Sequence, residues 1–189
     1  MPSKRTRALD AAVELLASSG LRALTHVRVD ERADLPTGST SNYFRTRAAL
    51  LVGVADRIVE RELPLVERTF SPRSPGELID AMCAALEVIT GDNRVVTTAR
   101  LVLFMEASHN PTVREALSRG RGTMEAAVID ALAGMGARDP LASTQAIAAC
   151  FEGLTLHRIA RHVITDPRPV FETVVLGAFA GHRQATPSA

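Results

Sequence analysis

This sequence of 189 residues has few aromatic residues, few cysteines and no long apolar run. It contains no Trp, one Tyr and six Phe, so aliphatic side chains must fill most of any core. Cys83 and Cys150 are too few and too far apart for a disulfide framework or a cysteine metal site, and we expect buried structural thiols. No stretch reaches the roughly 20 apolar residues that span a bilayer, and the N-terminus lacks a secretion signal. We therefore expect a cytoplasmic protein without membrane contact.

The charge is nearly balanced over the chain but unevenly placed along it. The formal net charge is +1, with 46% hydrophobic and 23% charged residues, which is an ordinary composition for a chain that folds throughout. Residues 1–61 hold ten Lys and Arg against seven Asp and Glu, whereas residues 62–189 hold twelve against fourteen. This asymmetry favours an N-terminal part that faces phosphate groups.

The apolar residues near the N-terminus recur at the spacing of short helices. They predict one helix over residues 6–18, which Gly20 ends. Thr25 fits the N-cap of a second helix, which cannot run past residue 35 because Pro36 restricts the residue before it. Residues 36–39 have turn chemistry, and residues 40–44 suffice only for a third, short helix.

The rest of the chain also has helical periodicity. Thr46 can cap a long helix that ends at the stretch 71–75. Further helices are predicted over residues 76–90, 93–107, 111–133, 141–164 and 170–181. No run alternates like a strand for long enough to compete. We predict an all-α fold of about nine helices, with a three-helix helix-turn-helix domain over residues 1–50 and a larger helical bundle over residues 51–189.

A short helix, a turn containing glycine and another short helix form the unit that enters the major groove of DNA, which is about 12 Å wide. The third helix is rich in side chains that form hydrogen bonds. Asn42 could pair with an adenine edge and Ser39 with several bases, while Gly38 allows close backbone approach. The alternative is a structural helical corner whose polar side chains face water.

The segment from Ala11 to Leu51 resembles the DNA-binding domain of the TetR family of transcriptional regulators. The matching residues are Ala12, Leu15, Leu16, Gly20, Leu24, Thr25, Val29, Ala33, Gly38, Tyr43, Phe44, Leu50 and Leu51. The resemblance implies that residues 37–44 form the recognition helix, and it places Arg47 where the family has a phosphate-binding lysine. The DNA-binding residues it suggests are Thr25, Thr37, Gly38, Ser39, Ser41, Asn42, Tyr43, Arg45 and Arg47.

Several residues qualify this resemblance. Asp34 replaces a usual glycine, Asp30 replaces a usual alanine, and Ser41 with Asn42 replaces a common aromatic pair. Asp tolerates the left-handed conformation that a glycine would adopt at position 34. We assign Phe44 to the core. The basic residues Lys4, Arg5 and Arg7 predict either a flexible arm near the DNA backbone or a merely solvated tail.

The resemblance also implies that the second domain binds a small effector and forms a homodimer through its last two helices. Small residues that would let helices approach closely lie at Ala142, Ala146, Ala149, Gly153, Val170, Val174, Gly177, Ala178 and Gly181. The alternative is that they pack inside one subunit. Apolar residues that could line an effector pocket, or simply form core, are Met82, Leu86, Leu101, Phe104, Met105, Met124, Phe151 and Leu154, with His157 as a polar partner.

The sequence does not favour an enzyme. It has no glycine-rich phosphate loop, no nucleophile elbow and no metal-ligand spacing, since His157 and His162 lie about 140° apart on a helix. We expect no cofactor and no metal. We expect a dimeric repressor that an unknown small-molecule effector releases from a palindromic double-stranded operator. The alternatives are a helical ligand-binding protein or enzyme with a purely structural N-terminal unit, and an activator or effector-independent regulator.

Overall fold

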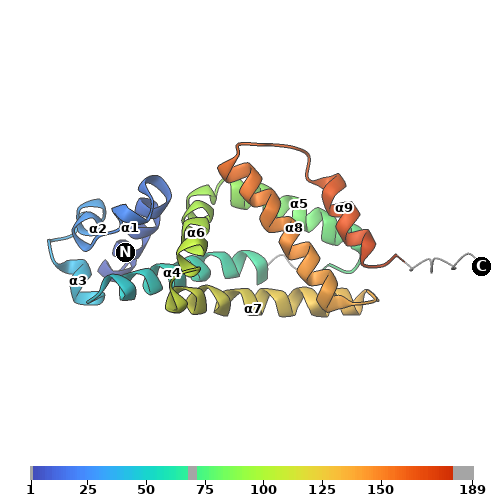
Figure 1. The fold of residues 1–189 in the computed structure, drawn as a ribbon, viewed down its shortest axis with the longest axis horizontal. Coiled ribbons are helices and arrows are strands. Elements are labelled where there is room, and N and C mark those ends of the chain that lie inside the picture. Colours follow the sequence, from blue (N-terminus) through green and yellow to red (C-terminus); the bar gives the residue numbers. More distant parts are fainter. Residues whose placement is uncertain (1, 68–71, 181–189) are drawn as a thin grey trace, which may run out of the picture.

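The computed structural model describes residues 2–67 and 72–180, and within these ranges it contains helices and no strands (Figure 1). The helices are α1 (Lys4–Ser19), the 3-10 turn η1 (Leu21–Ala23), α2 (His26–Arg32), α3 (Ser39–Tyr43), α4 (Arg47–Glu67), α5 (Pro75–Thr90), α6 (Arg94–Ala107), α7 (Pro111–Gly134), α8 (Pro140–Ala160) and α9 (Arg168–Gly177). The prediction of an all-α fold with a short second and third helix is confirmed.

Helix α1 begins earlier than the apolar pattern predicts. The Ser3 hydroxyl accepts a hydrogen bond from the backbone N–H of Thr6 and so caps the helix. The Arg7 guanidinium donates to the backbone oxygens of Ala33 (2.6 Å) and Asp34 (2.8 Å) at the end of α2. The expectation of a flexible basic arm over Lys4 to Arg7 is therefore wrong. Periodicity misses this first turn because its side chains are polar.

Helix α2 has the ends that the sequence predicts. The Thr25 hydroxyl accepts from the N–H of Arg28, and at the other end Asp34 has a φ of +50°. The N–H of Leu35 donates to the backbone oxygen of Asp30, and this hydrogen bond closes the turn around the left-handed Asp34. Asp34 therefore replaces the usual glycine without a change of fold.

Two clusters of buried apolar side chains hold the helices together. The first joins α1, α2, α4, α6 and the start of α7, and it contains Phe44 with Leu16, Leu35 and Leu50, as predicted. The second, which includes Phe171, joins α5, the end of α7, α8 and α9. Helix α4 packs along α7 and α1 packs on α6. The first cluster therefore contains residues on both sides of the predicted domain boundary between residues 50 and 51. This boundary lies inside α4, and the division into two domains stays a prediction.

The C-terminal helices end earlier than expected. Helix α8 was predicted to reach residue 164, but it ends at Ala160, and His162 has a φ of +54°. The N–H of Val163 donates to the backbone oxygen of His157 around this left-handed residue, and the buried Arg158 guanidinium joins the last turn to α5 by donating to the Glu87 carboxylate (2.7 Å). Cys83 and Cys150 are free, half-buried thiols beside the second cluster, and burial raises the pKa of both. No helix in the described ranges is long and apolar enough to cross a membrane.

Candidate nucleic-acid interface

Helix α3 lies at one end of the molecule, where it follows a left-handed turn (Figure 1). Gly38 has a φ of +89°, a conformation that favours glycine, and it leads directly into the helix. Thr37, Ser41, Asn42 and Tyr43 are exposed, the last with 46% of its surface open to solvent. The chain thus presents most of the predicted recognition residues outward on one short element.

The serine hydroxyls on this element have local partners. Ser39 Oγ donates to the backbone oxygen of Pro36 (2.6 Å), and Ser41 Oγ donates to that of Gly38 (2.8 Å). Hydroxyls bound in this way can still accept a hydrogen bond, but their protons are engaged. The exposed side chains of Asn42 and Tyr43 are therefore the more available donors for base edges or phosphates.

The inner side of α3 is held by a carboxylate that the sequence reasoning did not assign a role. Asp30 on α2 is 2% exposed, and its Oδ2 accepts from the N–H of Gly38 at 2.8 Å. Its Oδ1 accepts from both the N–H and the hydroxyl of Thr40, which is fully buried. The signal in the sequence was the departure itself, an acid where the family usually has alanine.

The other end of α3 is also tied to α2. His26 Nε2 lies 2.6 Å from the backbone oxygen of Phe44, and since a carbonyl can only accept, this nitrogen donates. The guanidinium of Arg5 lies over the Phe44 ring at 5.4 Å from its centroid. The end of α3 is thus fixed by contacts from both earlier helices.

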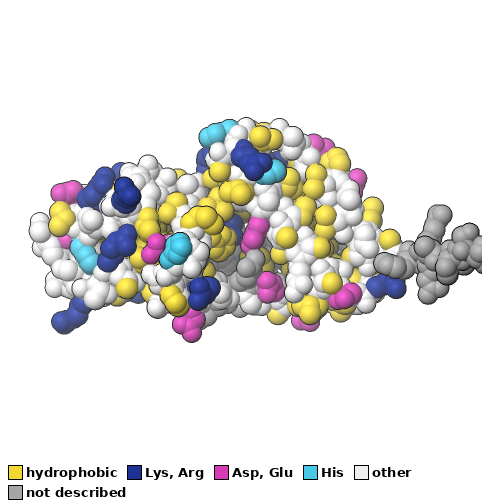
Figure 2. All heavy atoms as spheres, in the orientation of Figure 1, with side chains coloured by type: hydrophobic (Ala, Val, Ile, Leu, Met, Phe, Trp, Pro, Cys, Tyr) yellow, Lys and Arg dark blue, Asp and Glu magenta, His cyan; other side chains and the backbone are white. Residues whose placement is uncertain are grey.

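Positive side chains surround the exposed face of this unit. Arg45 is exposed, and Arg47 is exposed while donating to the backbone oxygen of Leu21 (3.0 Å). Thr25, also exposed, is already used as a cap, as described above. Arg22 and Arg28, which the sequence reasoning did not select, are exposed near the start of α2. Figure 2 shows dark blue Lys and Arg side chains gathered around this end of the molecule.

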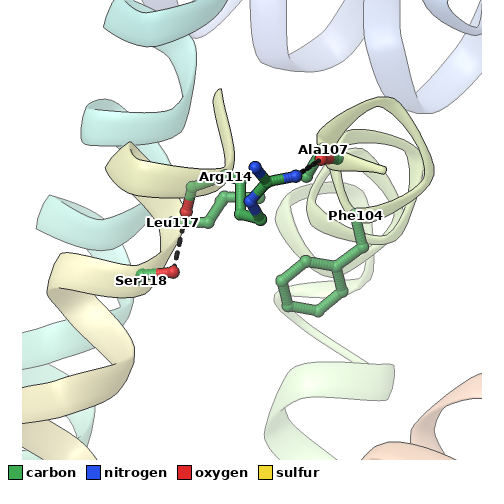
Figure 3. A pocket seen from close by; sticks show the side chains of 5 residues that line it. All are labelled: Phe104, Ala107, Arg114, Leu117 and Ser118. Carbon is green, nitrogen blue, oxygen red and sulfur yellow. Dashed lines mark hydrogen bonds between the residues drawn. The ribbon is translucent and has the colours of Figure 1, made fainter. Parts of the chain in front are cut away.

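The structure disperses the residues proposed for an effector pocket. Met82 and Leu86 are buried in the second cluster, with Phe151 and Leu154 packed against it, and Leu101 and His157 are half-buried. Met105 is 72% exposed and Met124 is 39% exposed. Phe104 lines a cavity of about 90 Å³ with Ala107, Arg114, Leu117 and Ser118 (Figure 3). Cavities that hold drug-sized ligands have about 300 to 1,000 Å³. An effector pocket lined by the predicted residues therefore remains a prediction.

The small residues predicted for a dimer interface fall into two groups. Ala142, Ala146 and Ala149 are exposed on α8, and an added Cβ at Gly153 would meet nothing within 4 Å. Val170 and Gly177 are exposed on α9, whereas Val174 packs against the second cluster and Ala178 is half-buried. Gly181 lies outside the described residues. Yellow side chains also spread over the surface of α8 in Figure 2. The outer face of α8 is therefore apolar and uncovered in the isolated chain.

The described residues bring together no group of three or more His, Cys, Asp or Glu that could hold a metal ion. What they do bring together is a short exposed polar helix, held from its inner side and flanked by arginines. Such a unit, joined to a larger helical bundle, defines the class of all-α helix-turn-helix proteins.

Comparison with known proteins specifies the class. The family profile described as tetracyclin repressor-like, C-terminal domain, matches residues 73–181. An HTH-type transcriptional regulator in the dhlA 5′ region of Xanthobacter autotrophicus is 39% identical over 59 residues, which are 31% of this chain and 29% of that protein. The chain belongs to the TetR family of transcriptional regulators.

Solved structures share the fold over nearly the whole chain. A transcriptional regulator of Streptomyces coelicolor A3(2) has a TM-score of 0.77 at 21% identity, covering 95% of this chain and 100% of that one. One from Rhodococcus sp. Rha1 has a TM-score of 0.82 at 17% identity, covering 94% and 96%. The multidrug binding protein EbrR, complexed with ethidium, has a TM-score of 0.73 at 23% identity, covering 92% and 98%.

Proposed function

We propose that this protein is a dimeric, sequence-specific DNA-binding regulator that represses transcription until a small molecule releases it from its operator. The observation that carries the DNA-binding part is the outward presentation of Asn42 and Tyr43 on α3, with Arg45 and Arg47 immediately after it. An amide and a phenol are groups that pair with base edges or phosphates, and the arginines can neutralise phosphates on either side.

The dimer is supported by the apolar outer face of α8. Exposed apolar helix faces of this kind are buried when a second copy packs against them, and a two-fold dimer presents two copies of α3 to paired half-sites. A palindromic operator follows from that symmetry. The expected compartment is the cytoplasm, where the operator lies.

Release by an effector is supported by the relatives rather than by a cavity of suitable size. EbrR, which shares the fold, was solved with ethidium. An effector acts if it binds one dimer conformation better than another, so that the spacing between the two copies of α3 shifts away from the operator. An effector of this protein needs a larger cavity than the one beside Phe104, so its binding has to open additional space.

The test is selection of bound duplexes from a random pool at low salt. The natural chain is compared with a variant that carries Asn42→Ala and Tyr43→Ala, and with a control that carries Asp92→Ala and Val95→Ala at exposed positions of α6 and the turn before it. The proposal predicts a two-fold symmetric site for the natural chain and the control, which the α3 variant loses. A folded natural chain that enriches no site would favour the alternative of a helical ligand-binding protein or enzyme.

A further inference from the structure

The recognition helix is too short to hold its own geometry. Helix α3 has five residues, whereas isolated helices need about 12 to 15 residues to be even marginally stable in water. Its N-cap residue is Gly38, which has no side chain to accept from the free N–H groups of the first turn. Something outside α3 must therefore fix where the reading side chains point.

Asp30 supplies the missing cap from the neighbouring helix. Its carboxylate accepts from the N–H of Gly38 and the N–H of Thr40, which are orphan donors at the start of α3. A negative group at this end also interacts favourably with the dipoles of the helix. The Thr40 hydroxyl provides a third donor, so the buried charge is surrounded by hydrogen bonds.

His26 holds the opposite end. It lies one helical turn before Asp30 on α2, so both side chains are on the face that contacts α3. Asp30 contacts the first turn of α3, and His26 contacts the backbone oxygen of Phe44 directly after its last residue. We infer that Asp30 and His26 are positioning residues that form a two-point clamp and set how α3 reads DNA. This inference rests on the proposed DNA-binding function.

The clamp is tested first without DNA, by amide hydrogen exchange of the full chain. In the natural chain the amides of Gly38 and Thr40 are expected to be protected, although they lie at the start of a short helix. Asp30→Asn replaces one of the two accepting carboxylate oxygens with an NH2 group, which cannot accept, so one of the two amides loses its partner. The exchange of that amide is expected to accelerate about fivefold or more, the effect of a lost cap. Unchanged exchange would overturn the clamp, whatever the chain does with DNA.

Binding then separates positioning from charge. Asp30→Asn and the control Asp34→Asn each remove one negative charge from the same turn, and asparagine tolerates the left-handed conformation at position 34. If charge alone mattered, both variants would bind every duplex slightly more tightly. We expect Asp30→Asn to bind the selected duplex about tenfold more weakly, the size of a strong cap. Its affinity for an unrelated duplex should stay within twofold, and Asp34→Asn should keep the natural ratio of the two affinities.

His26 provides the rescue experiment. His26→Ala removes the donor to Phe44 and should lower the ratio of selected to unrelated affinity, whereas His26→Gln keeps a donor of similar reach and should restore it. Circular dichroism establishes that each variant is folded, and Thr40→Val, which removes one of three donors to Asp30, replaces Asp30→Asn if the latter is not. A natural ratio in all of these variants would overturn the inference. A natural chain that selects no duplex would overturn the proposed function, while the exchange experiment still decides the clamp.

Discussion

The ring of Phe44 lies directly against the backbone of Gly53 on α4. A Cβ at Gly53 would be 2.5 Å from Cε1 of Phe44 and 3.2 Å from Cδ2 of Leu9. Since Phe44 directly follows the last residue of α3, this contact packs the end of α3 against the long helix that follows it. The glycine is needed for close approach and not for an unusual backbone conformation.

Gly53→Ala is therefore expected to destabilise the fold. The added methyl group has to displace the buried Phe44 ring, which costs about 1 to 3 kcal/mol for overpacking of a core. Urea unfolding followed by circular dichroism measures the change. The control is Gly134→Ala at the end of α7, where a Cβ would meet nothing within 4 Å. If both variants unfold at the same urea concentration, the close packing of Gly53 has no energetic role.

The ion pair between Glu62 on α4 and Arg100 on α6 predicts a pH dependence of stability. Glu62 Oε1 and Arg100 Nε lie 3.2 Å apart, and neither buried atom has a hydrogen-bond partner among the described residues. Desolvation raises the pKa of Glu62, while the charge of Arg100 opposes the shift. The folded chain therefore holds this proton more tightly than the unfolded chain does.

The sign of the effect follows from that difference. The stability that Glu62 contributes is present below the pKa of an unfolded glutamate, about 4.3, and is lost as the pH rises through the raised pKa of the folded state. Relative to Glu62→Gln, the natural chain should thus lose unfolding free energy between pH 4 and neutral pH. Glu115→Gln, at an exposed position of α7, should leave the pH profile unchanged. Parallel profiles for the natural chain and Glu62→Gln would contradict the raised pKa.

Phosphate contacts by the arginines after α3 should appear in the salt dependence of DNA binding. Arg45→Ala and Arg47→Ala are each expected to lower the slope of log affinity against log salt concentration by about 1, because each removes one phosphate contact. The weakening should be similar for selected and unrelated duplexes. Arg138→Ala, an exposed arginine in the turn between α7 and α8, should keep the natural slope. If Arg45→Ala and Arg47→Ala keep the slope of the natural chain, as Arg138→Ala should, these phosphate contacts are excluded.

The exposed face of α8 should decide the oligomeric state. Ala149→Arg places a long charged side chain on the proposed interface, and burial of that charge without a partner is costly. Sedimentation equilibrium should therefore show a dimer for the natural chain and a monomer for this variant. Ala126→Arg, the same substitution at an exposed position of α7, should stay dimeric. A dimer that survives Ala149→Arg would place the interface elsewhere.

Helix caps and turns were predictable from the sequence where a single residue determines them. Thr25 and Thr46 cap their helices as expected, with Thr46 Oγ1 accepting from the N–H of Ala49, and Asp34 takes the left-handed turn. Each of these outcomes depends only on neighbours within a few positions along the chain. The burial of Phe44 was predicted as well, although its apolar partners Leu16, Leu35 and Leu50 lie on other elements of the unit.

Relations between helices were harder to predict. Periodicity marks Met105 and Leu86 alike as apolar positions, yet one is exposed and the other fully buried, because burial depends on which helix packs alongside. The clamp was missed for the same reason, since Asp30 and Thr40 form a pair only after α2 and α3 cross. The buried Arg158 near the end of α8 likewise finds its partner in Glu87, 71 residues earlier in the chain.

In the N-terminal unit, the residues that hold α3 in place are different from the residues that α3 presents to solvent. This separation affects how the sequence of such a protein can change during evolution. Asp30, His26 and Thr40 hold α3 from within, while Asn42 and Tyr43 face outward and carry none of that support. Substitutions at the outward positions can therefore accumulate without loss of folding. Under the proposed function, a lineage that keeps the inner three residues acquires a new operator by altering only the outer ones.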